Sequence, residues 1–339
     1  MSLSKPSLIK KLPNIAVIGA GIAGLSCAAK LKEFGYAVEI FDKSRGTSGR
    51  MSTRRGEGWA ADHGAQYFTA RDPRFIKEVE RWIQAEVLSL WQPHLKVYEE
   101  GHWRDSGSQD KRYVGIPEMT SPGKYIASNL SVRLNTTINQ IERRADGWHI
   151  HSAESGEIPA IYDYVLIAVP APQAEALAAS HDQRIKNLAQ SVHMQACWTV
   201  MARFEKKMDL PYDAAFINHE RLSWICRNNS KPERVGLESW VIHATPQWSQ
   251  KNVELTAEEA TAELLRSAKS IGFDCQGAQT SAQRWRYASG SLDPSPVCHL
   301  SIEAHLGLCG DWLNGGRVEG AWLSGLELAH RLHLSHSSP

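Results

Sequence analysis

The stretch "IAVIGAGIAGLSCAA", residues 15–29, decides the fold of this 339-residue chain. Gly19, Gly21 and Gly24 form a G-x-G-x-x-G pattern directly after a β-branched run, and residues 25–34 read as a helix. Strand, tight turn and helix in this order are typical of a unit that binds a dinucleotide, with the pyrophosphate on the helix N-terminus. The sequence therefore predicts a Rossmann-type nucleotide site.

The segment that follows supports this interpretation. A second strand over residues 37–41 ends at Asp42, where the pattern requires an acid for a ribose hydroxyl. Lys5, Lys10 and Lys11, followed by an apolar run, also resemble an export signal. The glycine spacing and the second strand favour the nucleotide site, because a signal peptide needs neither.

Composition limits the other classes of function. With 38 basic and 37 acidic residues the net charge is +1, which gives no general reason to expect nucleic acid or a membrane surface as partner. The six cysteines are scattered and never form C-x-x-C, so we expect free thiols in a reducing cytoplasm. His330, His333 and His336 could line one helix face, but with no acid or thiol nearby we predict no metal site.

Local patterns predict several further elements. Residues 73–90 have helical spacing, and "GKYIASNL" reads as another helix. Short strands are expected to turn at Asp146-Gly147, and "YDYVLIAVPAP" is typical of a strand buried on both faces of a parallel sheet. The last segment returns to strand, glycine-rich turn and helix. We therefore predict two interleaved domains, a nucleotide-binding domain and a substrate domain: 13–72, 119–172 and 300–334 for the first, 73–118 and 173–299 for the second.

The loop after the second strand resembles that of a known superfamily. "KSRGTSGRMSTRR" carries Gly49, Arg50 and Met51, and "ADHGAQYFTARD" follows. Both are similar to segments of the flavin-containing amine oxidases, whose C-terminal element resembles Gly310-Asp311 and "GGRVEGAWLSG". This resemblance implies FAD and an α/β fold: a Rossmann-type FAD-binding domain interleaved with a mixed α+β substrate domain, as in amine oxidase and p-hydroxybenzoate hydroxylase.

The resemblance also implies how FAD is held. Arg50 would neutralise pyrophosphate charge, Asp311 would accept a ribityl hydroxyl, and the helix near Val318 would point amide groups at the flavin. The stretch "RVEGAWLSG" lacks the cysteine that attaches the flavin in monoamine oxidases, so FAD should be non-covalent. The expected FAD contacts are Gly19, Gly21, Ala23, Gly24, Asp42, Lys43, Gly49, Arg50, Met51, Gln66, Ile138, Gly310, Asp311, Arg317, Val318, Glu319 and Ala321.

Within the superfamily the chain is most similar to the bacterial renalases. The segments that carry this likeness are "DKSRG..GRMS", "GAQYFTARD", "RNNSKPER", "WVIHAT.QWS" and "GRVEGAWLSG". It implies an oxidase that takes a hydride from 2- or 6-dihydro-NAD(P) and passes the electrons to O2, giving NAD(P)+ and H2O2. No second G-x-G-x-x-G follows a strand, so this substrate would enter the flavin pocket itself. We expect a monomer or a homodimer.

Such a reaction needs residues that stack on and orient a flat ring. The expected catalytic residues are Gln66, Tyr67, His243, Trp285 and Trp312. The expected substrate contacts are Tyr67, Phe68, Arg71, Arg227, Asn228, His243 and Trp285. Several readings stay open here: the tryptophans could be ordinary core residues, His243 a satisfied strand histidine, and the segment 227–234 a charged surface turn.

Two rival functions remain open. One is oxidation of a small amine on the same fold, which would need an apolar funnel leading to the flavin. The other is a non-catalytic protein that keeps FAD for structure. Fold analogy alone excludes neither of them.

Overall fold

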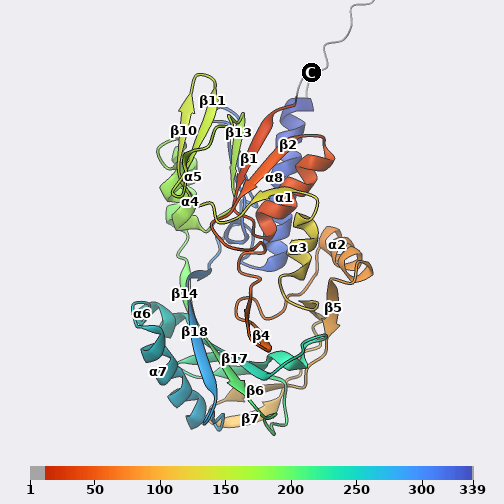
Figure 1. The fold of residues 1–339 in the computed structure, drawn as a ribbon, viewed down its shortest axis with the longest axis vertical. Coiled ribbons are helices and arrows are strands. Elements are labelled where there is room, and N and C mark those ends of the chain that lie inside the picture. The colour runs from red at the N-terminus through yellow and green to blue at the C-terminus, as the bar shows by residue number, and fades with distance from the viewer. Residues whose placement is uncertain (1–11, 338–339) are drawn as a thin grey trace, which may run out of the picture.

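The computed structural model describes residues 12–337, so Lys5, Lys10 and Lys11 lie outside the described residues. The chain forms two lobes (Figure 1). One is built on a six-stranded sheet with the order β19-β20-β13-β1-β2-β9, and the other on a seven-stranded sheet with the order β18-β14-β17-β16-β15-β6-β7. We call them the nucleotide lobe and the substrate lobe.

The nucleotide lobe has the predicted parallel core. β1 lies between β2 and β13 and pairs in parallel with both, and β20 pairs in parallel with the far side of β13. A three-stranded antiparallel sheet, β10-β11-β12, packs beside it and turns at Gly147 as expected. The strands of the lobe are β1 (Asn14–Ile18), β2 (Ala37–Phe41), β9 (Ser131–Arg133), β10 (Ile138–Arg144), β11 (Gly147–Ser152), β12 (Gly156–Glu157), β13 (Tyr164–Ile167), β19 (His299–Ser301) and β20 (Leu306–Leu308).

Helices from both ends of the sequence cover this sheet. The first and last helices lie against each other so closely that a Cβ placed on Gly325 would meet the carbonyl oxygen of Ala23 at 2.0 Å. The lobe therefore joins residues from near the start of the chain to residues from near its end. Its helices are α1 (Ile22–Glu33), α3 (Ser121–Ala127), α4 (Ala171–Ala178), α5 (Gln183–Ser191) and α8 (Val318–Ser337), with the 3-10 turn η2 (Asp311–Leu313).

The substrate lobe is mainly antiparallel, with β15 and β6 as its parallel pair. Helices α6 (Pro246–Lys251) and α7 (Ala257–Ser270) lie on the side of this sheet away from the nucleotide lobe (Figure 1). The sheet consists of β6 (Leu95–Glu99), β7 (His102–Asp105), β14 (Gln195–Phe204), β15 (Ala214–Asn218), β16 (Leu222–Arg227), β17 (Glu238–Ala244) and β18 (Gln279–Ser289).

Smaller elements lie between the two sheets. The hairpin of β3 and β4 reaches down from the nucleotide lobe towards β17 (Figure 1). These elements are β3 (Thr53–Gly56), β4 (Trp59–Asp62), α2 (Pro73–Gln84), β5 (Leu88–Trp91), β8 (Arg112–Gly115) and the 3-10 turn η1 (Asn228–Ser230).

The helix predicted over residues 73–90 is too long. α2 ends at Gln84, and the chain turns at Glu86, whose φ of 55° is incompatible with a continuing helix, before β5 begins. The domain division stays a prediction. Within the predicted substrate segment, however, Ile185 and Ala189 of α5 share a core with Ile18 and Phe41 of the nucleotide sheet.

All six cysteines lie among the described residues and none forms a disulfide, as expected. Within residues 12–337, no helix combines the length and the hydropathy that crossing a bilayer would require.

Candidate functional site

The glycine turn after β1 leaves open space where the pyrophosphate is expected. A Cβ on Gly24 would lie 2.0 Å from the carbonyl oxygen of Gly19, so Gly24 lets α1 pack onto the turn, whereas a Cβ on Gly21 would meet nothing within 4 Å. Gly21 is also the N-cap of α1, and no side chain caps the first N–H groups of that helix. An open turn below an uncapped helix N-terminus fits a phosphate.

The loop after β2 folds back over this turn. Asp42 accepts hydrogen bonds from the backbone N–H of Ala20 at 2.7 Å and of Ser44 at 2.8 Å. Ser48 donates its N–H to the Ala20 carbonyl, and a Cβ on Gly49 would lie 3.2 Å from the Cα of Gly21. The Asp42 carboxylate keeps lone pairs for a ribose hydroxyl while it holds the turn in place.

Arg50 and Asp311 come from opposite ends of the chain and form an ion pair at 2.5 Å. Arg50 also donates to the carbonyl of Ala288 at 3.1 Å, and its own carbonyl accepts the N–H of Ala65 at 2.9 Å. A Cβ on Gly64 would meet the Arg50 carbonyl oxygen at 1.9 Å. Arg50, the predicted pyrophosphate arginine, is therefore in direct contact with the backbone of Gly64 and Ala65, two residues that line a pocket.

The other predicted FAD contacts lie in varied surroundings. Lys43 and Arg317 are exposed, while Met51 and Ile138 are buried in the core. The Glu319 carboxylate accepts the N–H groups of residues 71 and 72, so it anchors the start of α2. Gly310 is buried and donates its N–H to Ser324, and Ala23, Val318 and Ala321 pack against the core of the lobe. Contact of these residues with FAD stays a prediction.

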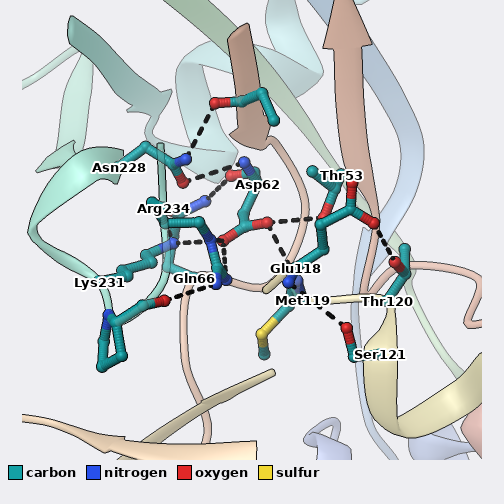
Figure 2. Close-up of polar contacts among 12 residues, drawn as sticks. Thr53, Asp62, Gln66, Glu118, Met119, Thr120, Ser121, Asn228, Lys231 and Arg234 are labelled. Atoms are coloured by element: carbon teal, nitrogen blue, oxygen red, sulfur yellow. Dashed lines mark hydrogen bonds and ion pairs between the residues drawn. The ribbon is translucent and has the colours of Figure 1, made fainter. Parts of the chain in front are cut away.

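A buried ion cluster lies between β4 and the turn η1 (Figure 2). The Asp62 carboxylate is fully buried, 3.1 Å from Lys231 Nζ and 2.8 Å from Arg234 Nη2. Burial opposes its ionisation, but the two cations outweigh burial and lower the pKa of Asp62 below its usual value. Thr53 donates to the carboxylate at 2.6 Å and the Met119 N–H at 3.2 Å. Two cations and one anion give this cluster a net charge of +1.

The cluster continues into the pocket through Gln66. Lys231 donates to Gln66 Oε1 at 3.3 Å (Figure 2 shows this contact). The Gln66 amide nitrogen donates to the carbonyls of Asp62 and Gly64 and lies 3.4 Å from His243 Nε2. Burial, with Lys231 and His63 adding to it, lowers the pKa of His243 to about 3. At neutral pH His243 is therefore an uncharged ring beside the Gln66 amide.

These residues form one wall of a pocket of about 380 Å³. The pocket brings together Gln66, Tyr67 and His243, as predicted, and its lining contains no charged side chain of either sign. Tyr67 and Trp224 present rings 5.7 Å apart between centroids, tilted by 50°. The lining residues are Gly64, Ala65, Gln66, Tyr67, Phe216, Ser223, Trp224 and His243. The arrangement suits a flat, neutral ring with a polar substituent.

Trp285 supports this pocket from outside its lining. It stacks on the His63 ring at 5.1 Å and donates its indole N–H to the His63 carbonyl at 3.0 Å. Burial and the charge of Arg54 lower the pKa of His63 to about 4, so this ring too is neutral. Trp285 therefore fixes the backbone directly before Gly64.

Six of the predicted residues lie outside the pocket lining: Trp285, Trp312, Phe68, Arg71, Arg227 and Asn228. Trp312 is fully buried, and its indole N–H donates to Val169, so it is a core residue. Phe68 packs on Phe75 and Trp82, and Arg71 is exposed beside Asp110.

Arg227 and Asn228 also serve the fold. Arg227 lies 3.4 Å from Glu238 and donates to the Met208 carbonyl. The Asn228 side chain donates to the Ala60 carbonyl and accepts the backbone N–H of Asp62. The interpretation of this segment as a charged surface turn is equally wrong, because Lys231 and Arg234 within it are buried.

Sequence reasoning missed part of the pocket. Phe216, Ser223 and Trp224 line it, but they lie in strands whose composition is that of any core strand. Lys231 and Arg234 lie inside "RNNSKPER", a segment in which Arg227 and Asn228 were the predicted contacts. Lys231 and Arg234 follow the turn η1 within four positions. Nothing in this short stretch of sequence indicates that both side chains pair with Asp62.

Comparisons with known proteins identify the family. Residues 92–333 match the flavin containing amine oxidoreductase family, and residues 17–81 match an NAD(P)-binding Rossmann-like domain. A Drosophila melanogaster protein described as a possible lysine-specific histone demethylase 1 is 43% identical over 65 residues, which are 19% of this chain and 7% of that protein. A Staphylococcus aureus (strain Newman) 4,4'-diapophytoene desaturase is 44% identical over 51 residues, which are 15% of this chain and 10% of the desaturase. The matches thus span a tenth or less of these curated relatives.

Solved structures extend the likeness to the whole fold. Cyclohexylamine oxidase from Brevibacterium oxydans IH-35A has a TM-score of 0.73 at 12% identity, over 96% of this chain and 100% of the oxidase. Putrescine oxidase bound to putrescine has a TM-score of 0.72 at 12% identity, over 95% and 99%. A fatty acid isomerase from P. acnes scores 0.72 at 13% identity, with the same coverage of 95% and 99%. At these identities the likeness concerns the fold alone.

The open glycine turn, the uncapped α1 and the pair of Arg50 and Asp311 fit FAD, the cofactor of the matched family. No cysteine stands in residues 310–325, around the start of α8, where a covalent attachment would be expected. The family model covers well over half of the chain. The chain therefore belongs to the flavin-containing amine oxidoreductases and is an FAD-dependent oxidoreductase.

Proposed function

We propose that this protein oxidises 2- or 6-dihydro-NAD(P) to NAD(P)+, with O2 as electron acceptor and H2O2 as product. The observation that carries the proposal is the chemistry of the pocket: a flat aromatic space with an amide and a neutral imidazole, and no acid in its lining. A dihydropyridine ring with a carboxamide substituent matches those groups. The renalase-like segments of the sequence support the same substrate.

The roles of the residues follow from their neighbours. Tyr67 and Trp224 would pack on the dihydropyridine ring, and His243 would hold the carboxamide through a hydrogen bond. Lys231 and the Asp62 carbonyl hold the Gln66 amide in place, and this amide would lie beside the imidazole during turnover. FAD, when bound, would supply the hydride acceptor, and reduction of O2 to H2O2 would use the two electrons and the hydrogen of that hydride together with one proton from solvent. The protein needs to position the ring rather than move protons.

Charge argues against a cationic amine as substrate. Most amines are protonated at neutral pH, and an acid in the pocket is the partner that would stabilise such a cation most strongly. The pocket lining has no acid, and the cluster behind it carries a net charge of +1. A protonated amine would therefore be repelled at the place where it must react.

Oxidation of a small neutral amine stays the second candidate. The fold likeness to cyclohexylamine oxidase favours it, and Phe216, Trp224 and Tyr67 would form the apolar wall that it needs. A non-catalytic role for the flavin is the third.

One experiment separates the three functions. The FAD-loaded protein is mixed without oxygen with chemically isomerised NADH, ordinary NADH, cyclohexylamine or putrescine, and flavin absorbance is followed. We expect rapid bleaching by the isomers, slow or no bleaching by the others, and H2O2 once oxygen is admitted. Faster bleaching by an amine would replace our proposal with amine oxidation. If no compound bleaches the flavin, the non-catalytic role is favoured.

A further inference from the structure

A second cavity, of about 510 Å³, opens on the nucleotide lobe and shares no lining residue with the substrate pocket. Three segments form it: the start of α5, the stretch 296–302 around β19, and the last turns of α8. None of the residues proposed to contact FAD or the substrate lines this cavity. Its chemistry can therefore be considered separately from the flavin reaction.

The lining of this cavity carries two guanidinium groups. Arg184 is exposed, and its side chain forms no hydrogen bond or ion pair within residues 12–337. Arg331 donates from Nε to Glu327 at 2.8 Å and from Nη1 to the carbonyl of Cys298 at 3.4 Å. Its Nη2 has no hydrogen-bond acceptor in the described part of the chain. Both side chains thus keep accessible donors at the cavity.

The acids beside these arginines do not line the cavity. Asp182 accepts the backbone N–H groups of residues 184 and 185 at 2.7 Å and 3.0 Å, and its other oxygen lies 3.2 Å from His299 Nε2. The Asp182 side chain is only 8% exposed. Glu327 pairs with Arg331 from outside the lining. An anion that enters the cavity therefore meets two arginines and no carboxylate in its walls.

Much of the remaining lining is aliphatic. Pro296, Leu300 and Ile302 contribute to it, and the Ile302 side chain is 47% exposed. Covering such a side chain with the apolar part of a ligand is favourable, because it removes apolar surface from water. The lining contains no Phe, Tyr or Trp on which a flat base could stack. A hydrocarbon chain suits it better.

Hydrogen bonds fix the cavity wall at Val297. This residue donates its N–H to the Leu313 carbonyl at 3.0 Å, and its own carbonyl accepts the Ser324 hydroxyl at 2.5 Å. Its φ of 65° lies in the left-handed region, which a β-branched residue rarely adopts. The fold thus holds a strained residue between Pro296 and Cys298, both of which line the cavity. The wall is in place before a ligand arrives.

We infer that this cavity binds an aliphatic anion, with a carboxylate or phosphate head on Arg184 and Arg331 and the hydrocarbon chain on Leu300 and Ile302. Guanidinium groups bind both kinds of head through paired, charged hydrogen bonds. The inference goes beyond the proposed function and does not depend on it, because no group of the flavin reaction takes part.

Calorimetric titration of the FAD-loaded protein tests the inference. The probes are hexanoate, hexyl phosphate and hexanol, which has the same chain without a charge. We expect Arg184→Met and Arg331→Met each to weaken binding of the anions by about 10-fold, the loss expected for one charged hydrogen-bond partner, and to leave hexanol unchanged. The control Arg104→Met removes an exposed arginine that pairs with Glu99 and should change none of the affinities.

A charge reversal makes the test sharper. Arg184→Glu changes an exposed side chain without a partner in the described chain, so it should fold, and it should weaken both anions more than Arg184→Met does. It also replaces Arg331→Met if that variant does not fold. Tighter binding of hexanoate than of hexyl phosphate, or the reverse, identifies the head group of the ligand.

Three results would overturn the inference: neither anion binds the wild type, hexanol binds as tightly as hexanoate, or the anion affinities are unchanged in both Arg184 variants. Flavin reduction by the dihydro-NAD isomers is measured separately, and its failure would remove the proposed substrate while leaving this site intact.

Discussion

Different kinds of interaction hold the glycine turn with Asp42, which we call the nucleotide end, and the pocket with its ion cluster, which we call the pocket end. At the nucleotide end the groups are mostly backbone and lie close in sequence, as with Asp42 and Ala20, which are 22 positions apart. At the pocket end they are charged side chains from distant segments, as with Lys231 and Asp62, which are 169 positions apart. The first end depends on the conformation of the chain, and the second on a buried charge network.

The largest expected effect breaks the network. Asp62→Asn leaves Lys231 and Arg234 buried without their acid, so we expect the free energy of unfolding to fall by about 3–5 kcal/mol. Urea denaturation of the FAD-loaded protein measures it. The control Asp105→Asn removes a carboxylate exposed on β7 and should leave the urea midpoint unchanged. Equal shifts in the two variants would mean that the cluster does not contribute as a buried network.

The second prediction removes FAD binding at the nucleotide end without unfolding the protein. Gly21 has φ −73° and ψ 175°, angles that valine adopts readily, and open space around its Cβ position. Gly21→Val should therefore fold but lose its yellow colour, because the side chain occupies the space for the pyrophosphate. FAD released on denaturation is measured against Gly107→Val, at a glycine that is equally open but lies far from the turn. Full FAD content in Gly21→Val would refute our reading of the glycine turn.

The third prediction concerns acid. An unfolded histidine gains a proton near a pKa of about 6.5, whereas His243 in the folded protein stays neutral down to about 3. Unfolding therefore takes up a proton between these values, and stability is lost as the pH falls from about 6.5 to about 3. We expect the melting temperature to fall less steeply over this window in His243→Gln than in the wild type. His102→Gln, at an exposed histidine of β7, should keep the wild-type slope, and identical slopes in all three proteins would contradict the prediction.

The smallest expected effect concerns Trp285, and it tests whether this residue serves the pocket end or the nucleotide end. Trp285 holds His63, directly before the lining residue Gly64, so Trp285→Ala should slow flavin reduction by the isomers about fivefold without releasing FAD. Stopped-flow absorbance gives the rate. Trp285→Phe keeps a ring on His63 but loses the hydrogen bond, and should lie between the two. Release of FAD from Trp285→Ala would assign this residue to the nucleotide end.

The sequence predicts the first end better than the second for a physical reason. The Gly19 to Gly24 spacing and the acid at Asp42 act through local backbone geometry, which a short motif specifies. Lys231 and Arg234 form a cluster only because the fold of β4 places Asp62 within reach of both side chains. Nothing in the sequence around these two cations indicates that acid. Trp312 illustrates the opposite case, because its aromatic ring made it a candidate for stacking on the substrate, whereas its indole is fully buried and donates to the Val169 carbonyl.

The close contact of α1 with α8 has a consequence for how the protein is made. During synthesis the glycine turn leaves the ribosome early, but strand β20, which pairs with β13 in the same sheet, and the Asp311 that pairs with Arg50 are made only after the strands of the substrate lobe. The nucleotide lobe therefore cannot be completed before the strands of the substrate lobe have been synthesised. Retention of FAD then reports that a molecule has been synthesised to its final helix, and a chain that stops before residue 306 should remain colourless.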